Sequence, residues 1–479
     1  MAESSLKKQT KKGLLWTFFD KLVNYGLAFV VGIIMARKLA PSDYGLTALP
    51  AVFIAIAAIF VESGFGNAMI RKPELADSDL TTSFLYSISV GVFCYLIIFI
   101  CTPFIADFYK EPLLVPLVRI SSLTFLWSPL ATPQNILLKR KLAFNTIARI
   151  NITTRIIGAT IGIAAAYIGY GLWSLVIMNL VSSFFSFIQS WIAVKWIPKR
   201  GWSSNSFKYL WNFGNKLTAS SLLDTVYNNL TPIIVAKYFS TSELGFYNRA
   251  KNYADLPSMQ GTSIIQSVTF PVLSKLQYDT GALARNYRKM LRVSAFVIFP
   301  IMMMLAALAT PFIVLLVTDK WIDAVLLLQI MCFSAMWYPI HSINLNLLQV
   351  KGRSDLFLKL EFWKKIVGLV FMACTLPFGL VYFVSAGIAN SIIALVINTY
   401  YTGKLINVGF LTQMRDLIPT LFLSVLMFVV IYGVNQFIDN MWTQLILGLI
   451  IGPILYIGMA TIFKFPELQD LIYILNINK

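Results

Sequence analysis

Charged residues are scarce in this chain. They make up 13% of its 479 residues, whereas hydrophobic residues make up 58%. A soluble protein of this length would carry about twice that charged fraction. The composition therefore excludes an ordinary soluble enzyme and places most of the chain in a lipid bilayer.

Residues that could carry out chemistry are also few. The chain has a single histidine, His341, and four cysteines that all lie in apolar runs. It has no phosphate-binding glycine loop ending in Gly-Lys-Ser/Thr, no metal-type spacing of histidine and cysteine, and no plausible catalytic triad. We therefore expect no enzyme activity, no cofactor and no metal site, and we interpret the cysteines as small apolar residues rather than a disulfide set.

The net charge of +18 could suggest a nucleic-acid partner, but the apolar runs favour another explanation. Runs long enough to cross a bilayer need about 20 residues, and we predict about fourteen of them. They cover residues 14–35, 44–69, 81–103, 113–135, 147–168, 171–194, 209–236, 245–272, 290–317, 321–348, 357–380, 382–402, 417–437 and 442–463. The even number places both termini on the same side.

The basic residues fix which side that is. With the N-terminus in the cytoplasm, about 26 lysines and arginines fall on the cytoplasmic side and about 5 on the outer side, as the positive-inside rule requires. The positive charge therefore reflects topology, and we expect no nucleic-acid partner. The outer turns are all short, so a ligand site would have to lie within the membrane.

A ten-residue stretch occurs twice. Residues 36–45 and 236–245 share an alanine, a serine and a glycine at equivalent positions, and Asp43 of the first copy is replaced by Glu243 in the second. In each copy we expect a tight polar turn in which the serine and the acid cap the next helix. Duplication around a central site is common in transporters.

The fold class that follows is an all-α membrane protein with two pseudo-symmetric six-helix lobes around a central cavity. We place the lobes at 1–207 and 208–404, and two additional helices at 405–479. Prolines within the helices would allow them to bend during alternating access.

Charged and amide side chains at membrane depth are the candidate site residues, because a charge at the bilayer centre costs roughly 2.5–3.5 kcal/mol unless it faces water or a partner. The candidates for substrate binding are Lys21, Asn24, Arg155, Lys216, Asp224, Asn228, Arg249 and Lys251. The candidates for ion coupling are Glu62, Asp255 and His341. The excess of cations over acids favours an anionic substrate.

Several of these residues also have a structural interpretation. Lys21 and Lys216 lie near cytoplasmic helix ends, where a lysine can instead extend to the membrane surface. Lys251 and Asp255 are four residues apart and could neutralise each other. His341 could relay protons, but a hydrogen-bonded structural histidine is the commoner case.

The chain resembles the polysaccharide transporter branch of the multidrug/oligosaccharidyl-lipid/polysaccharide flippase superfamily, in particular the Wzx-like exporters of the colanic-acid and teichuronic-acid type. The resemblance rests on five ordered motifs. They are Leu-Ala-Pro-Ser-Asp-Tyr-Gly at 39–45, Pro-Gln-Asn-Ile-Leu-Leu-Lys-Arg-Lys-Leu-Ala-Phe at 133–144, Gly-Tyr-Gly-Leu-Trp-Ser-Leu at 169–175, Leu-Gly-Phe-Tyr-Asn-Arg-Ala at 244–250 and Phe-Pro-Val-Leu-Ser-Lys-Leu-Gln at 270–277.

This resemblance implies a bacterial inner-membrane protein that flips an undecaprenyl-pyrophosphate-linked oligosaccharide for surface polysaccharide synthesis. It implies two lobes in a V and a cationic lumen, with Arg249 in the fourth motif as a substrate contact. The partners would be the lipid-linked oligosaccharide, membrane lipids, and polysaccharide polymerase or chain-length machinery. The alternatives are a cation-coupled multidrug exporter on the same fold, against which the basic bias argues, and a membrane polymerase or ligase, which would normally need a large outer loop.

Overall fold

The computed structural model describes residues 2–199 and 201–470, and every regular element in these ranges is a helix. The chain forms two compact units, residues 1–245 and 246–479. The dividing point lies near the start of α11 (Thr241–Lys275), so α10 (Ser204–Tyr238) groups with the first unit. Functional lobes at 1–207 and 208–404 remain a prediction.

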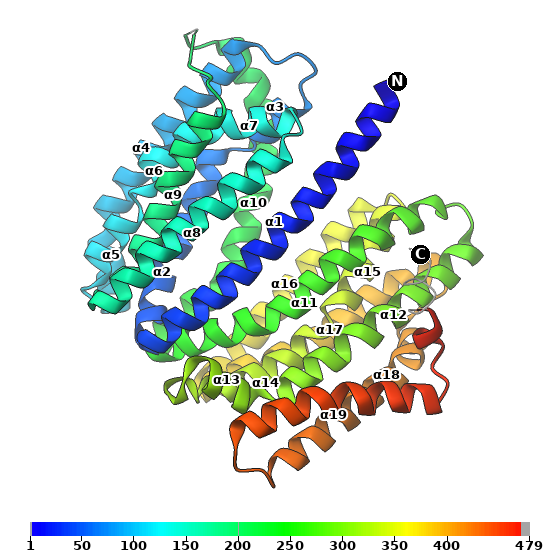
Figure 1. The fold of residues 1–479 in the computed structure, drawn as a ribbon. Helices are drawn as coiled ribbons and strands as arrows, with labels where there is room; N and C mark the ends of the chain where they lie inside the picture. The colour runs from blue at the N-terminus through cyan, green and yellow to red at the C-terminus, as the bar shows by residue number, and fades with distance from the viewer. Residues whose placement is uncertain (1, 200, 471–479) are drawn as a thin grey trace. The chain divides into compact units, whose positions relative to one another are not determined.

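Unit 1 contains both long and short helices joined by turns (Figure 1). The elements before α10 are α1 (Ala2–Lys38), α2 (Pro41–Glu62), α3 (Phe65–Arg71), α4 (Asp77–Tyr109), α5 (Leu114–Ser121), α6 (Thr124–Trp127), the 3-10 turn η1 (Ser128–Ala131), α7 (Thr132–Arg140), α8 (Phe144–Ile168) and α9 (Trp173–Ala193). The predicted span 113–135 is broken into α5, α6, η1 and α7. Pro129 lies in the η1 break and Pro133 in the first turn of α7, as expected of residues that cannot donate a helix hydrogen bond.

Unit 2 holds most of α11 and the remaining elements. They are α12 (Thr280–Ala307), α13 (Ala309–Val317), η2 (Asp319–Trp321), α14 (Ala324–Ala335), α15 (Tyr338–Val350), α16 (Ser354–Thr375), η3 (Leu376–Phe378), α17 (Leu380–Ile406), α18 (Phe410–Asn435) and α19 (Met441–Ile462). Each of the fourteen predicted spans falls on one helix or on one interrupted helix. Eleven of these, counted over the described residues, are long and apolar enough to cross a membrane.

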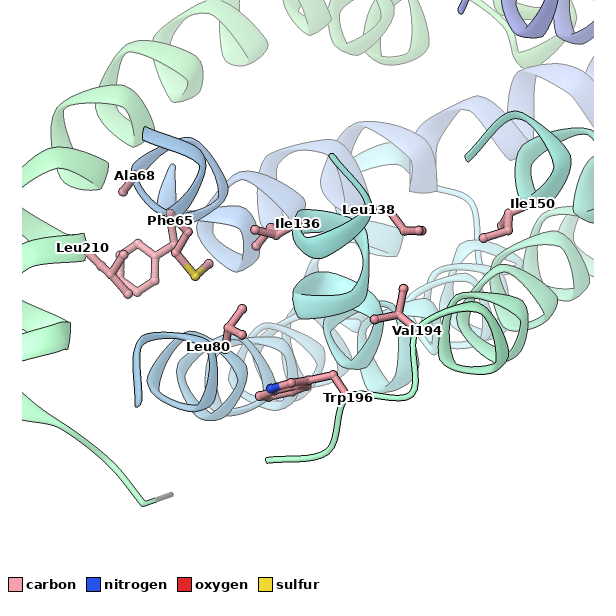
Figure 2. Packing of buried hydrophobic residues seen from close by; sticks show 10 residues of the cluster. Phe65, Ala68, Leu80, Ile136, Leu138, Ile150, Val194, Trp196 and Leu210 are labelled. Carbon is pink, nitrogen blue, oxygen red and sulfur yellow. The ribbon is translucent and has the colours of Figure 1, made fainter. Parts of the chain in front are cut away.

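The core of unit 1 joins segments that are far apart in the sequence. Figure 2 shows Phe65 of α3 beside Leu210 of α10, with Leu80 of α4 and Ile136 of α7 in the same cluster. Trp196, which follows α9, closes the cluster and is buried. Burying a large apolar side chain contributes about 1.5–3 kcal/mol, so this cluster fixes α10 onto unit 1.

Small residues bring α8 and α9 together along their length (Figure 1). Gly158 and Gly162 form a Gly-x-x-x-Gly pattern on α8, a pattern that lets membrane helices approach closely. A Cβ atom on Gly162 would lie 2.6 Å from Cβ of Met178 on α9. One face of α8 is occupied by α9, and α1 packs on another face of α8. The contact is made by Val31 and Met35 of α1 and Ala159 of α8, which belong to one apolar cluster.

The repeated stretches form the turns that start α2 and α11. In the first copy the carboxylate of Asp43 accepts a hydrogen bond from the backbone N–H of Ala40 at 2.9 Å. In the second, Glu243 accepts from the backbone N–H of Ser240 at 2.9 Å, and the Ser240 hydroxyl accepts from the N–H of Glu243 at 3.1 Å. The predicted capping by the acids is confirmed. The repeated serines do not cap, because Ser42 lies inside the first turn of α2.

The two additional helices are tied to α12 at one end by ion pairs. Nε and Nη2 of Arg288 donate to the two carboxylate oxygens of Asp416 on α18, both at 2.7 Å. Lys289 pairs with Asp470 at 2.6 Å, and Arg292 pairs with Glu467 at 3.2 Å. These basic residues were expected as topology signals. In the structure they also attach α18 and the segment after α19 to α12.

Replacing Asp416 with Asn should lower the free energy of unfolding by about 1–2 kcal/mol, because the buried carboxylate loses a bidentate, charge-assisted pair with a half-exposed arginine. The measurement is chemical or thermal unfolding of the purified protein in detergent. Asp355→Asn is the matched control, since its pair with Arg353 is exposed on both sides and should give no measurable change. Equal effects of the two substitutions would contradict this assignment.

Candidate functional site

Three long helices differ from the other membrane-length helices in their polarity. α10 and α11 have 35 residues each and α16 has 22, so all three are long enough to span a bilayer. None of them is among the eleven helices that are apolar enough to do so in lipid alone. A spanning helix with this many polar groups must turn its polar face to water or to protein partners.

On α10 the polar residues form an exposed stripe. Lys216, Ser220, Asp224 and Asn228 follow one another at intervals of four residues, and all four are exposed. Residues four apart lie on the same face of a helix. The structure therefore places three predicted site residues, Lys216, Asp224 and Asn228, on one open face of unit 1.

A second polar group lies where α1 packs on α8. The carboxylate of Asp20 accepts hydrogen bonds from Nδ2 of Asn24 at 2.6 Å and from Nδ2 of Asn151 at 3.0 Å. One turn further along, Nη1 of Arg155 donates to the backbone oxygen of Asn24 at 3.4 Å. The side chains of Lys21 and Arg155 are exposed beside this group. We call Asp20, Asn24, Asn151 and Arg155 the α1–α8 cluster.

The α1–α8 cluster follows from the register of the two helices. They run parallel, with apolar contacts toward their later turns and the polar residues toward their earlier ones. Asn24 and Arg155 were predicted site residues, and the structure brings them together. Asn151 was missed, although its spacing of four residues from Arg155 is a signal that places both on one face of α8.

The exposed charges on the α10 stripe and at the α1–α8 cluster are mostly positive. Lys21, Arg155 and Lys216 are exposed cations, while the acids are Asp20 and Asp224. Asp20 accepts two amide hydrogen bonds, and the contact that Arg155 makes here is from Nη1 to a backbone oxygen. A guanidinium carries several further N–H donors. This arrangement suits an anionic group with several oxygen acceptors.

Arg249 lies in unit 2, on the third turn of α11. Its guanidinium lies 5.3 Å from the ring centre of Trp321 and 5.6 Å from that of Tyr253, and the residue is only 7% exposed. Such contacts hold the cation by cation–π attraction. Its contact with substrate remains a prediction.

Replacing Arg249 with Ala should abolish surface polysaccharide while the protein remains in the membrane. The loss would follow from removing a buried cation that the rings of Trp321 and Tyr253 hold in place. Surface polysaccharide is measured together with the amount of protein in the membrane fraction. Normal export by the variant would remove Arg249 from the site, and disappearance of the protein would assign it to structure instead.

The other candidates have partners that the structure identifies. Lys251 and Asp255 form the expected ion pair, at 2.5 Å, so the two residues together carry no net charge. His341 contacts Ser391 Oγ through Nε2 at 3.0 Å and Asn398 Nδ2 through Nδ1 at 3.2 Å. Both ring nitrogens are thus hydrogen-bonded, as in a structural histidine.

Glu62 is exposed at the last residue of α2. An ion-coupling role for Glu62, Asp255 or His341 remains a prediction. Among residues 2–199 and 201–470, no three His, Cys, Asp or Glu side chains are close enough together to hold a metal ion.

Known proteins are similar to this chain in sequence or in fold. The lipopolysaccharide biosynthesis protein WzxC of Escherichia coli K12 is 27% identical over 75% of this chain and 74% of its own length. The teichuronic acid biosynthesis protein TuaB of Bacillus subtilis 168 is 25% identical over 74% of this chain and 73% of its own length. Among solved structures, the lipid II flippase MurJ in an inward closed conformation matches with a TM-score of 0.75 and 16% identity, over 96% of this chain and 99% of that one.

The match to MurJ concerns the fold alone at this level of identity. The sequence profile of the family described as "polysaccharide biosynthesis protein" matches residues 34–326, which is more than half of the chain. That range includes the α1–α8 cluster residues Asn151 and Arg155, the polar stripe of α10, and both copies of the repeated turn from residue 34 onward. The chain therefore belongs to this polysaccharide biosynthesis protein family, as the ordered motifs predicted.

Proposed function

We propose that this protein carries lipid-linked oligosaccharide units, joined to undecaprenyl pyrophosphate, across the bacterial inner membrane for the synthesis of surface polysaccharide. Membership of the polysaccharide biosynthesis family supports the substrate class. The observation that carries the proposal is the pair of exposed polar faces in unit 1, on α10 and at the α1–α8 cluster, on helices that would otherwise face only lipid or protein.

In this proposal the cations bind the pyrophosphate. Arg155 offers a planar fork of donors that matches phosphate oxygens, and Lys21 adds a second positive charge on the neighbouring helix. Asp20 and Asn151 hold α1 against α8, so that the two cations keep their spacing. The prenyl tail stays in the bilayer, since its apolar surface gains nothing from entering a wet site.

The polar stripe of α10 would provide the remaining contacts. Lys216 and Asn228 carry donors for phosphate and sugar oxygens, and Asp224 carries acceptors for sugar hydroxyls. Movement between the two sides would occur by alternating access of the two six-helix lobes, with both termini in the cytoplasm. The polymerase or chain-length machinery would act on the delivered units.

The proposal is tested by removing the gene from its host. The deletion strain should lose surface polysaccharide and accumulate the lipid-linked oligosaccharide, and the intact chain supplied on a plasmid should restore export. The accumulated species is measured by extraction and mass spectrometry, which also identifies its sugars. Unchanged surface polysaccharide with no accumulated lipid-linked species would contradict the proposal.

A further inference from the structure

A cavity of about 300 Å³ lies inside unit 1, outside the polar faces described above. It is bounded by α2, α5, α6 and α9. Of these helices, α5 packs on both α2 and α9, and α6 packs on α9. Its lining residues come from the first few turns of α2 and α9, which follow turns predicted to be on the outer side. The cavity is therefore closer to the predicted outer side than Lys21 is.

The polar groups that line the cavity are all uncharged. They are the hydroxyls of Thr47, Ser121 and Thr124 and the amide of Asn179, which is exposed. The other seven of the eleven lining residues are apolar, and they range from Ala51 to Leu180 in size. The four hydroxyl and amide groups carry no formal charge, and they offer both donors and acceptors to a neutral polar ligand.

Local hydrogen bonds orient these groups. Oγ1 of Thr47 donates to the backbone oxygen of Asp43 at 2.9 Å, so its lone pairs remain available to a ligand donor. Thr124 shares a hydrogen bond of 2.8 Å with Ser183. Pro50, which also lines the cavity, has no N–H with which to satisfy the helix carbonyl of Leu46.

The cavity adjoins the helices that carry the cationic group, because its lining residue Leu175 packs in one cluster with Val31 of α1 and Ala159 of α8. α8 and α9 are antiparallel neighbours, and Met178, next to Asn179, faces Gly162 of α8. Gly162 lies seven residues beyond Arg155 on α8, which corresponds to about 10 Å along the helix axis. The cavity is therefore displaced from Arg155 toward the predicted outer side, which is the direction in which sugars attached to a pyrophosphate at Arg155 would have to extend to reach it.

We infer that this cavity is a sugar subsite, which binds the uncharged sugar residues next to the pyrophosphate of the lipid-linked substrate. The inference rests on the proposed function and extends it, since it divides recognition between a cationic pyrophosphate site and a neutral sugar site. The apolar C–H faces of a sugar ring suit the alanine and proline walls, and its hydroxyls suit the threonine, serine and asparagine groups.

The test compares two probes on the full-length protein in detergent: undecaprenyl pyrophosphate without sugar, and the lipid-linked oligosaccharide extracted from the host. Wild type should bind the sugar-bearing probe more tightly than the bare one. Asn179→Ala should weaken binding of the sugar-bearing probe about tenfold, because the asparagine amide no longer donates and accepts hydrogen bonds. Binding of the bare probe should be unchanged. Ala51→Trp, which fills the cavity, should abolish the difference between the two probes.

Leu96→Trp on α4 is the matched control, because it places the same bulk on an exposed apolar face outside the cavity and should bind both probes as wild type does. If Asn179→Ala weakens binding of both probes equally, or of neither, the inference of a sugar subsite is wrong. If Ala51→Trp weakens binding of the bare probe as much as binding of the sugar-bearing probe, the cavity holds a lipid chain instead.

If the wild-type protein binds neither probe, the proposed function itself is contradicted. That outcome differs from failure of the sugar subsite alone, in which the wild-type protein still binds the bare probe.

Discussion

Replacing Lys21 and Arg155 together with Gln should weaken binding of undecaprenyl pyrophosphate about a hundredfold. A hydrogen bond to a charged group contributes about 1.5–3 kcal/mol, and each 1.4 kcal/mol is a tenfold change in affinity. Each single substitution should therefore cost about tenfold. Glutamine keeps much of the side-chain length while removing the charge, so the expected loss comes from electrostatics and not from packing.

The dissociation constant is measured with purified protein in detergent at several salt concentrations. Charge-dependent binding should weaken as salt rises in wild type, and this dependence should be smaller in the double variant. Arg149→Gln is the matched control, because Arg149 is an exposed arginine nearer the start of the same helix and outside the α1–α8 cluster. An unchanged affinity in the double variant, or an equal loss in the control, would remove the cluster from the substrate site.

The second large effect is expected at the repeated turns. A Cβ atom on Gly45 would lie 1.8 Å from the backbone oxygen of Thr241, and one on Gly245 would lie 1.9 Å from the backbone oxygen of Pro41. The obstacle is backbone in both cases, so no side chain can rotate away. Alanine at either position must push apart the first turns of α2 and α11, at a cost of the order of 1–3 kcal/mol or more.

Gly45→Ala and Gly245→Ala should therefore lower the midpoint of thermal unfolding in detergent and reduce export. Gly433→Ala on α18 is the control, since a Cβ there meets no atom within 4 Å. Inside a helix, alanine is more favourable than glycine by about 0.5–1 kcal/mol, so this control should raise the midpoint slightly. A rise in the midpoint at all three positions would show that the two turns are not in close contact.

The helical nature of the long apolar runs could be predicted because each signal is local. Runs of apolar residues mark the spans, and the paired stretches 36–45 and 236–245 mark two equivalent turns. The close contact of Gly45 with Thr241 could not be predicted, because it joins residues about two hundred positions apart. The repeat shows that the turns are alike, and only the structure shows that they touch each other.

The candidate site was predictable in its residue types and less so in its grouping. Lys21, Asn24 and Arg155 stand out as polar residues in apolar surroundings. The hydrogen bond from Asn151 to Asp20 spans 131 positions and depends on the register of α1 on α8, which no local pattern contains. In the same way, the sequence identifies Arg288 only as one of the basic residues on the cytoplasmic side. Its contact with Asp416, 128 positions later, is seen only in the structure.

Arg249 illustrates why position in a motif does not determine role. The sequence places it at membrane depth with no acid nearby, which favours a substrate contact. In the structure the Arg249 guanidinium contacts aromatic rings, because η2 positions the ring of Trp321 next to it. A cation stacked on aromatic rings can stabilise the fold, bind substrate, or do both, and the Arg249→Ala variant separates these roles.

The most direct test of the proposed transport uses the purified protein reconstituted into lipid vesicles that contain the lipid-linked oligosaccharide of its host. The sugar exposed on the outer surface is followed by a membrane-impermeant enzyme or lectin. We expect the inner-leaflet pool to become accessible in vesicles with the wild-type protein, and much more slowly in those with the Lys21→Gln/Arg155→Gln variant. Equal accessibility in protein-free and protein-containing vesicles would contradict the proposal that this chain moves its substrate across the bilayer.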